Sequence, residues 1–202
     1  MLPTSRQKPK AVLPSDHRFQ QGGALFLLSL LVFFLSSILL YAIYAYSRRE
    51  DPQTSSTLPS DFLISTVCLL LISGLIHWAT RTVRREQRKS TSILLCVSAV
   101  TAVLFISVQY QAMINLLSGP ALNGGTGKGI AGMVVVLAIL HALHVAGGVV
   151  ALGIVSIRAL LGRYDHERHW PVDFAAQYWH FLDLVWLCML AAFWLTSGGF
   201  AL

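Results

Sequence analysis

Two short stretches of this sequence contain the side chains that could do chemistry. His180 and Asp183 lie three residues apart in an apolar run that ends at Thr196. His141 and His144 have the same spacing in an earlier apolar run. Residues at i and i+3 share one face of a helix. An imidazole can ligate a metal or a haem iron, and a carboxylate can orient it or hold a proton. The candidate chemistry is therefore metal ligation, proton transfer or buried hydrogen bonding.

Asp183 needs a partner if its run crosses a membrane. It is the only carboxylate well inside any apolar run of the sequence. A central Asp in a membrane span costs roughly 2.5–3.5 kcal/mol on insertion scales, so such groups normally face protein and are paired. His180, one turn back on the same helix face, is the predicted partner.

These four residues can be interpreted as metal ligands or as a packing cluster. Because His141 and His144 are three residues apart, they would ligate the same side of one site, and the sequence has no obvious second haem pair. The favoured interpretation is a neutral polar cluster of His141, His144, His180 and Asp183 that joins two helices. Transmembrane contacts of this kind average about 0.6 kcal/mol. A b-type haem held by histidines of two facing helices is the alternative.

The remaining reactive residues indicate no catalytic site. Cys68, Cys96 and Cys188 lie singly in apolar runs, which predicts small buried residues rather than metal ligands. His77 stands at the end of its run and is predicted to be interfacial. The glycine-rich loop 123–129 lacks the spacing of a phosphate-binding loop. The sequence has no evident Ser–His–Asp set and no pair of carboxylates within the membrane, so these residue types do not indicate an enzyme.

The composition predicts what kind of protein positions these residues. Of 202 residues, 55% are hydrophobic and 12% are charged, whereas a soluble domain has about 25% charged residues. The mean hydropathy is +0.64. The chain is therefore predicted to be a polytopic membrane protein. Its net charge of +6 comes from residues between the apolar runs, which favours a topology signal over a nucleic-acid partner.

Five apolar runs are long enough to cross about 30 Å of hydrocarbon as helices. The predicted fold class is all-α, a bundle of five transmembrane helices in one domain of residues 22–197. The expected spans are 22–46, 61–80, 91–117, 130–160 and 174–196. Residues 1–21 are polar and basic, which predicts a mobile cytoplasmic tail.

The basic residues predict the orientation. Five spans place the two termini on opposite sides, and cytoplasmic loops are enriched in Lys and Arg. One side has only Arg48, Arg49 and Lys128. The other side has twelve basic residues: Arg6, Lys8, Lys10, Arg18, Arg81, Arg84, Arg85, Arg88, Lys89, Arg158, Arg163 and Arg168. The N-terminus is therefore predicted to be cytoplasmic and the C-terminus external.

Both stretches also carry a resemblance to a known family. Residues 178–186 read Tyr-Trp-His-Phe-Leu-Asp-Leu-Val-Trp, which resembles the last-helix signature of subunit III of haem–copper terminal oxidases, the cytochrome c and quinol oxidase family. Residues 141–145 read His-Ala-Leu-His-Val and are followed by glycines, which resembles that family's His-Gly-Leu-His-Val stretch. Gly147 is expected on the histidine face, where a small residue lets a second helix approach. Weaker matches extend the resemblance over about residues 22–197, and the five spans resemble the family's five-helix form.

The resemblance implies a function and partners. It implies a non-catalytic subunit of a bacterial haem–copper oxidase in the inner membrane, which packs on catalytic subunit I, stabilises it and binds phospholipid. Haem and copper would reside in partner subunits, with no cofactor in this chain. The family signature implies packing roles for Gly147, Gly148, Tyr178, Trp179, Phe181 and Trp186. The alternatives are an accessory protein of a nitric oxide reductase and an independent b-type cytochrome.

Two positions depart from the family pattern. Leu30 and Ala112 stand where members commonly carry glutamate. In members that have it, the glutamate of the first shared helix is linked to proton uptake by the catalytic subunit, so that role is not implied here. Leu30→Glu is predicted to lower stability, because a lone carboxyl in this span has no evident partner in the sequence.

Overall fold

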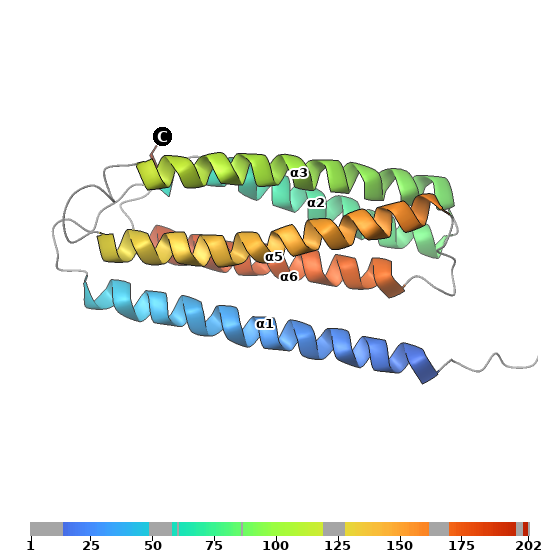
Figure 1. Cartoon of the computed structure of the whole chain (residues 1–202), viewed down its shortest axis with the longest axis horizontal. Helices are drawn as coiled ribbons and strands as arrows, with labels where there is room; N and C mark the ends of the chain where they lie inside the picture. Colours follow the sequence, from blue (N-terminus) through green and yellow to red (C-terminus); the bar gives the residue numbers. More distant parts are fainter. Residues whose placement is uncertain are drawn as a thin grey trace, which may run out of the picture.

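The computed structural model describes residues 14–48, 58–59, 61–85, 87–118, 128–161, 170–196 and 200–201. Five long α-helices make up nearly all of these residues (Figure 1). The glycine-rich loop, most of the predicted tail and the loop before the last span lie outside the described residues. The helices are α1 (Pro14–Ser47), α2 (Asp61–Arg84), α3 (Arg88–Ser118), α5 (Lys128–Leu160) and α6 (Trp170–Thr196). Each has the length and apolar composition of a membrane span. The predicted all-α class and the five transmembrane helices are confirmed.

The helices extend further than the apolar runs that predicted them. α1 begins at Pro14, inside the stretch expected as a tail, and α2 continues to Arg84. Proline suits the first turn of a helix because its fixed φ is helical and its missing N–H needs no partner there. Arg is a good helix former, and a charge is costly only within the hydrocarbon. Hydropathy therefore locates the membrane-crossing part of each helix rather than its ends.

α5 and α6 occupy the middle of the bundle. α2 and α3 make the most extensive contact, α3 also packs on α5, and α2 also packs on α6. α1 packs on α6 and α5, although α2 follows it in the sequence, and it lies along one side of the bundle in Figure 1. Only 17% of the α1 span is buried, against 33–44% in the other four spans. α1 is thus the helix with the largest surface left for lipid or other proteins.

One end of the bundle is closed by a short parallel strand pair. β1 (Leu58–Pro59) pairs with β2 (Phe200–Ala201), with Leu58 opposite Phe200 and Pro59 opposite Ala201. These strands follow α1 and α6 in the chain, so the pair joins the segment before α2 to the C-terminal end. The sequence does not predict this strand pair, because two residues are too few for a strand pattern.

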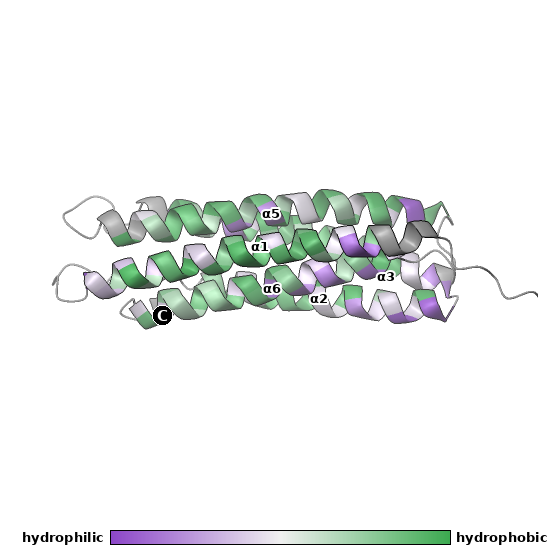
Figure 2. Ribbon diagram, turned by 90° about the horizontal axis from the view of Figure 1, so that it is seen from below, coloured by the Kyte–Doolittle hydropathy of each residue, from purple (hydrophilic) through white to green (hydrophobic). Residues whose placement is uncertain are grey.

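The opposite end of the bundle is polar. Figure 2 shows hydrophilic residues concentrated in the half of the bundle where α2 ends and α3 begins, including stretches of α1 and α6, with apolar residues predominating elsewhere. At this end Arg84 Nη2 lies 3.2 Å from Asp173 Oδ2 and joins α2 to α6. The Arg84 side chain is 60% exposed, and an exposed pair of this kind contributes at most about 1 kcal/mol. The bundle therefore depends mainly on the contacts within its apolar length.

Candidate functional site

The signature residues of α6 lie on its buried face. Tyr178, Trp179, Leu182, Asp183 and Trp186 are all buried, at the spacing of one continuous helical stripe. Trp179 and Trp186 are among the largest side chains that are fully enclosed. His180 points elsewhere and is exposed. The signature thus positions one helix against several neighbours at once.

His180 binds α2 rather than α5. Its Nδ1 is hydrogen bonded to the hydroxyl of Ser73, and its ring centroid lies 5.7 Å from that of His77. Ser73 and His77 are one turn apart on α2. His77, which the sequence predicts to be interfacial, is exposed in the structure. His180 therefore belongs to an α2–α6 contact.

Asp183 shares Ser73 with His180. The carboxylate is 6% exposed and lies beside the Ser73 hydroxyl, with which it interacts. One hydroxyl can serve both residues, because its hydrogen donates to the carboxylate while its oxygen accepts the Nδ1–H of the imidazole. Asp183 Oδ1 is buried without a partner among the described residues. The sequence predicts His180 as the direct partner of Asp183, whereas Ser73 of α2 links the two in the structure.

His141 is enclosed by aromatic rings. It is 1% exposed, and its ring stacks on Trp186 of α6 with centroids 5.4 Å apart and planes 28° apart. The ring centroid of Phe34 from α1 lies 6.0 Å from that of His141, with the planes 69° apart. Both of its ring nitrogens are buried without a hydrogen-bond partner in the described parts of the chain. The contact to Trp186 joins α5 to α6, which is the helix pair that the sequence analysis proposed for the cluster.

His144 packs on α1. Its ring centroid lies 5.0 Å from that of Phe34 and 6.1 Å from that of Phe33. Its Nδ1 lies 2.7 Å from the carbonyl oxygen of Leu140, one turn back in its own helix. Because a carbonyl only accepts, Nδ1 carries the hydrogen of this bond. His144 thus satisfies its donor within α5 and uses its ring as a packing surface.

The four predicted residues therefore lie in two groups. His180 and Asp183 meet at Ser73 of α2, whereas His141 and His144 contact α1 and Trp186. In the part of the chain that the structure describes, no three His, Cys, Asp or Glu side chains are grouped so that they could hold a metal ion. The predicted single cluster is thus two separate contacts that tie α6 and α5 to different neighbours.

The surroundings of the two histidines of α5 do not fit a b-type haem. Such a haem needs a histidine nitrogen directed at the iron with space for a macrocycle beside the ring. Rings of Trp186 and Phe34 lie against His141, and rings of Phe34 and Phe33 lie against His144. The contacts of these histidines are those of packed side chains.

Three further hydrogen bonds connect α6 to its neighbours. The Tyr178 hydroxyl donates to the His144 carbonyl oxygen at 2.8 Å, and Trp186 Nε1 donates to Thr66 Oγ1 of α2 at 2.9 Å. Near the other end of α6, the Tyr41 hydroxyl of α1 lies 2.5 Å from Thr196 Oγ1. α6 is therefore bonded to α1, α2 and α5. Ser73 and Thr66 are the residues that the sequence analysis gave no role in this site, and hydroxyls inside an apolar run are the signal that could have identified them.

Two other signature residues have side chains that make no hydrogen bond among the described residues. The ring centroid of Phe181 lies 6.5 Å from that of Phe34, which adds to the packing between α6 and α1. The indole nitrogen of Trp179 is buried without a hydrogen-bond partner among the described residues. Both side chains fit the packing roles that the resemblance implies.

The close approach of α5 to α6 occurs at Gly148, not at the predicted Gly147. A Cβ at Gly148 would lie 2.9 Å from Tyr178 Cε1, whereas a Cβ at Gly147 would meet nothing within 4 Å. At about 100° per residue, Gly148 lies some 40° from His144 around the helix and Gly147 lies some 60° to the other side. The contact stripe therefore follows His141, His144 and Gly148.

These two glycines give a matched pair for mutation. Gly148→Ala is expected to destabilise the chain by about 1–3 kcal/mol, as overpacking of a filled core does, because the new methyl group overlaps the Tyr178 ring. Gly147→Ala should be neutral, or stabilising by up to about 1 kcal/mol through helix propensity. Unfolding of each purified variant by SDS titration checks this. Equal effects of the two substitutions would contradict the assignment.

The sequence is similar to a known family over almost its full length. Residues 14–197 match the family described as "Cytochrome c oxidase subunit III". The chain is 27% identical to cytochrome c oxidase subunit 3 of Salmo salar and to that of Scyliorhinus canicula over 199 residues, covering 91% of this chain and 72% of each relative. It is 26% identical to the same subunit of Danio rerio with the same coverage. The matched region includes all five helices and both stretches that form the site.

Proposed function

We propose, since the chain belongs to the cytochrome c oxidase subunit III family, that it is a non-catalytic subunit of a bacterial haem–copper terminal oxidase. In this role it packs on catalytic subunit I and stabilises it while the complex reduces oxygen and pumps protons. The observation that carries the structural role is that the α6 signature residues pack against the neighbouring helices. Its polar and aromatic side chains contact Ser73, Thr66, His141 and Phe34 of the neighbouring helices. Such contacts hold helices together without requiring a reacting group.

The haem and copper of the complex are proposed to reside in the partner subunits, and phospholipid is proposed to bind this chain. The support for lipid is the outer surface of α1, where large apolar side chains such as Leu25 and Leu35 are more than 60% exposed. Side chains of this kind are suited to acyl chains, which offer no hydrogen bonds.

Purification from native membranes tests the assignment. We expect this chain to co-purify with a haem- and copper-containing subunit that consumes oxygen, and we expect the chain alone to show no Soret band. A stoichiometric haem on the single chain would support the independent cytochrome instead. Co-purification with an assembly that reduces nitric oxide but not oxygen would support the accessory-protein alternative. The haem types and the electron donor follow from the same preparation.

The orientation is proposed from the charge asymmetry. The polar end with Arg84 and Arg85 is placed on the cytoplasmic side, together with the N-terminus, and the C-terminus is placed outside. Reporter fusions that are active only in the cytoplasm should work at Met1 and in the loop after Arg85. They should fail at Leu202, and activity there would remove this orientation.

A proton-uptake role of the first span is not part of the proposal. Leu30 and Ala112 stand where family members commonly carry glutamate, and both are buried among apolar side chains. Neither side chain can hold or relay a proton. Carboxylate reagents that act within the membrane are accordingly expected to label this chain only at Asp183, if at all.

Asp183→Leu is expected to weaken the attachment of this chain to the complex. It removes the acceptor that Ser73 reaches from α2, with an effect of about 0.6–1.7 kcal/mol, the range of transmembrane hydrogen bonds. The chain should be lost at a lower detergent concentration, while the haem content of the catalytic subunit stays unchanged. Haem loss as the primary effect would contradict a structural role.

The variant Ser73→Ala provides the control for this result. Because Ser73 links both residues, Ser73→Ala and Asp183→Leu should be non-additive when combined. Additive losses would mean that Asp183 has a partner other than Ser73.

A further inference from the structure

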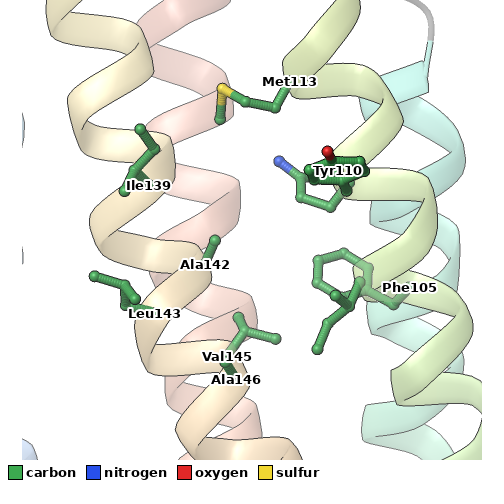
Figure 3. A pocket seen from close by; sticks show the side chains of 10 residues that line it. Phe105, Tyr110, Met113, Ile139, Ala142, Leu143, Val145 and Ala146 are labelled. Atoms are coloured by element: carbon green, nitrogen blue, oxygen red, sulfur yellow. The ribbon is translucent and has the colours of Figure 1, made fainter.

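A groove between α3 and α5 opens on the outer surface of the bundle. Its volume is about 240 Å³. Figure 3 shows Phe105, Tyr110 and Met113 on the α3 side facing Ala142 and Val145 on the α5 side. Phe105 is 1% exposed and forms part of the floor, whereas Tyr110 and Leu143 are 67% and 64% exposed and form the rim. The groove therefore lies within the membrane-crossing part of the bundle and is accessible from the side.

Gln109 is a buried polar residue that lines this groove. Its side chain is 4% exposed, and both Nε2 and Oε1 lack a hydrogen-bond partner among the described residues. Buried polar atoms are nearly always hydrogen bonded, and no water is available in a hydrocarbon core to supply the bond. A carboxamide left in this state indicates that something else completes the site.

The chemistry of Gln109 restricts the occupant. Nε2 must donate and Oε1 must accept, so the occupant needs both an acceptor and a donor. An acyl chain has neither, and a lipid ester has only acceptors. A hydroxyl or a carboxamide has both. The other groove residues are uncharged, so the surface that enters should carry no charge.

The shape of the groove fits a helix. Its α3 residues run from Phe105 to Met113, which is about 12 Å along the axis and slightly more than two helical turns. On the α5 side, Ala142 and Ala146 are one turn apart and line the groove. Small residues at this spacing let a second helix approach closely, and a row of side chains on one helix fits a groove between two others.

We propose that this groove docks a transmembrane helix of another subunit, which presents an uncharged face with a hydroxyl or carboxamide side chain to Gln109. The inference rests on the proposed place of this chain in a multi-subunit complex. It assigns to the α3–α5 surface a contact that is separate from the α6 signature, because none of the signature residues lines the groove.

Photocross-linking in native membranes tests the proposal. The probe is p-benzoyl-phenylalanine in place of Tyr110, at the rim of the groove. We expect an adduct with a transmembrane segment of another subunit, identified by mass spectrometry of the joined peptides. With Gln109→Leu added, the yield of this adduct should fall about threefold, the change that an average transmembrane hydrogen bond supports.

Gln111→Leu is the matched control. Gln111 is exposed on the same helix, bonds to Asn115 and does not line the groove, so its loss should leave the adduct yield unchanged. Adducts with lipid alone, an adduct with a water-exposed segment, or a yield that Gln109→Leu does not lower would each overturn the docking proposal. If the joined subunit belongs to a complex without haem and copper, the docking surface stands and the proposed oxidase function fails.

Discussion

Trp186→Ala is expected to destabilise the chain by about 3–5 kcal/mol, the range for removal of a large aromatic side chain from a core. Trp186 is 1% exposed and lies where three helices meet. Its ring stacks on His141 of α5 and packs edge to face with Phe62 of α2, with ring centroids 5.6 Å apart. Its indole nitrogen donates to Thr66. Removal leaves a cavity and takes away the bond that Thr66 accepts, although the Thr66 hydroxyl keeps its bond to the Phe62 carbonyl oxygen. Unfolding of the purified chain by SDS titration measures the loss.

Two further substitutions separate packing from hydrogen bonding at this site. Trp194→Ala on the same helix should cost less than about 1 kcal/mol, because Trp194 is 53% exposed. Trp186→Phe keeps most of the ring and removes only the bond to Thr66, so it should cost no more than about 1.7 kcal/mol. A loss for Trp186→Ala as small as that for Trp194→Ala would mean that α6 does not anchor the bundle.

Leu30→Glu is expected to be the second most damaging change. Leu30 is 8% exposed, and a carboxylate within a span costs roughly 2.5–3.5 kcal/mol. The residues one turn to either side on α1 show which surface it faces. Phe34 lies against His144, and Phe26 stacks on Tyr178 with ring centroids 6.1 Å apart. A glutamate at position 30 would therefore face α5 and α6.

The tautomer of His144 determines how far this glutamate can be stabilised. Nδ1 is engaged with the Leu140 carbonyl, so Nε2 of the neutral ring is an acceptor. A carboxylate would find no donor there, whereas a protonated carboxyl could donate. We therefore expect Leu30→Glu to lower the stability of the chain, and to lower it more in a His144→Leu background. Leu30→Gln should lower the stability less than Leu30→Glu does in either background.

Measurements on the complex complete this prediction. A carboxylate reagent should label the carboxyl group introduced by Leu30→Glu as a new site, and mass spectrometry can map it. If the chain belongs to a proton-pumping oxidase, as proposed, pumping should be the same with and without the substitution. A rise in sustained pumping with no loss of stability would show that the first span faces a proton-uptake path.

The four site residues form two separate contacts, which determines how substitutions at these residues should combine. Substitutions at His180 or Asp183 perturb the α2–α6 contact, whereas substitutions at His141 or His144 perturb the packing of α1 and Trp186. Effects of the two groups should therefore be close to additive, as for sites that share no partners.

The sequence alone determined the class of the protein and which of its segments cross the membrane. Whether a stretch enters a membrane depends on its own transfer free energy, which is a property of composition and length. For this reason the five spans follow directly from the apolar runs, and the signature on α6 could be identified from consecutive residues such as Trp179 and Asp183. The helix ends, at Pro14 or Arg84, were harder to predict from the sequence, because a charge costs little free energy outside the hydrocarbon.

Only the tertiary structure decided which residues meet. The partner of Asp183 is Ser73, which lies on a different helix far away in the chain, and the close approach falls at Gly148 rather than at Gly147. One residue turns a side chain by about 100° around its helix, and the rotation of each helix is set by its neighbours. Gln109 likewise lacks a hydrogen-bond partner among the residues that the structure describes, and this follows only from the packing of α3 against α5. A single sequence does not contain these rotations, because they result from the packing of all five helices together.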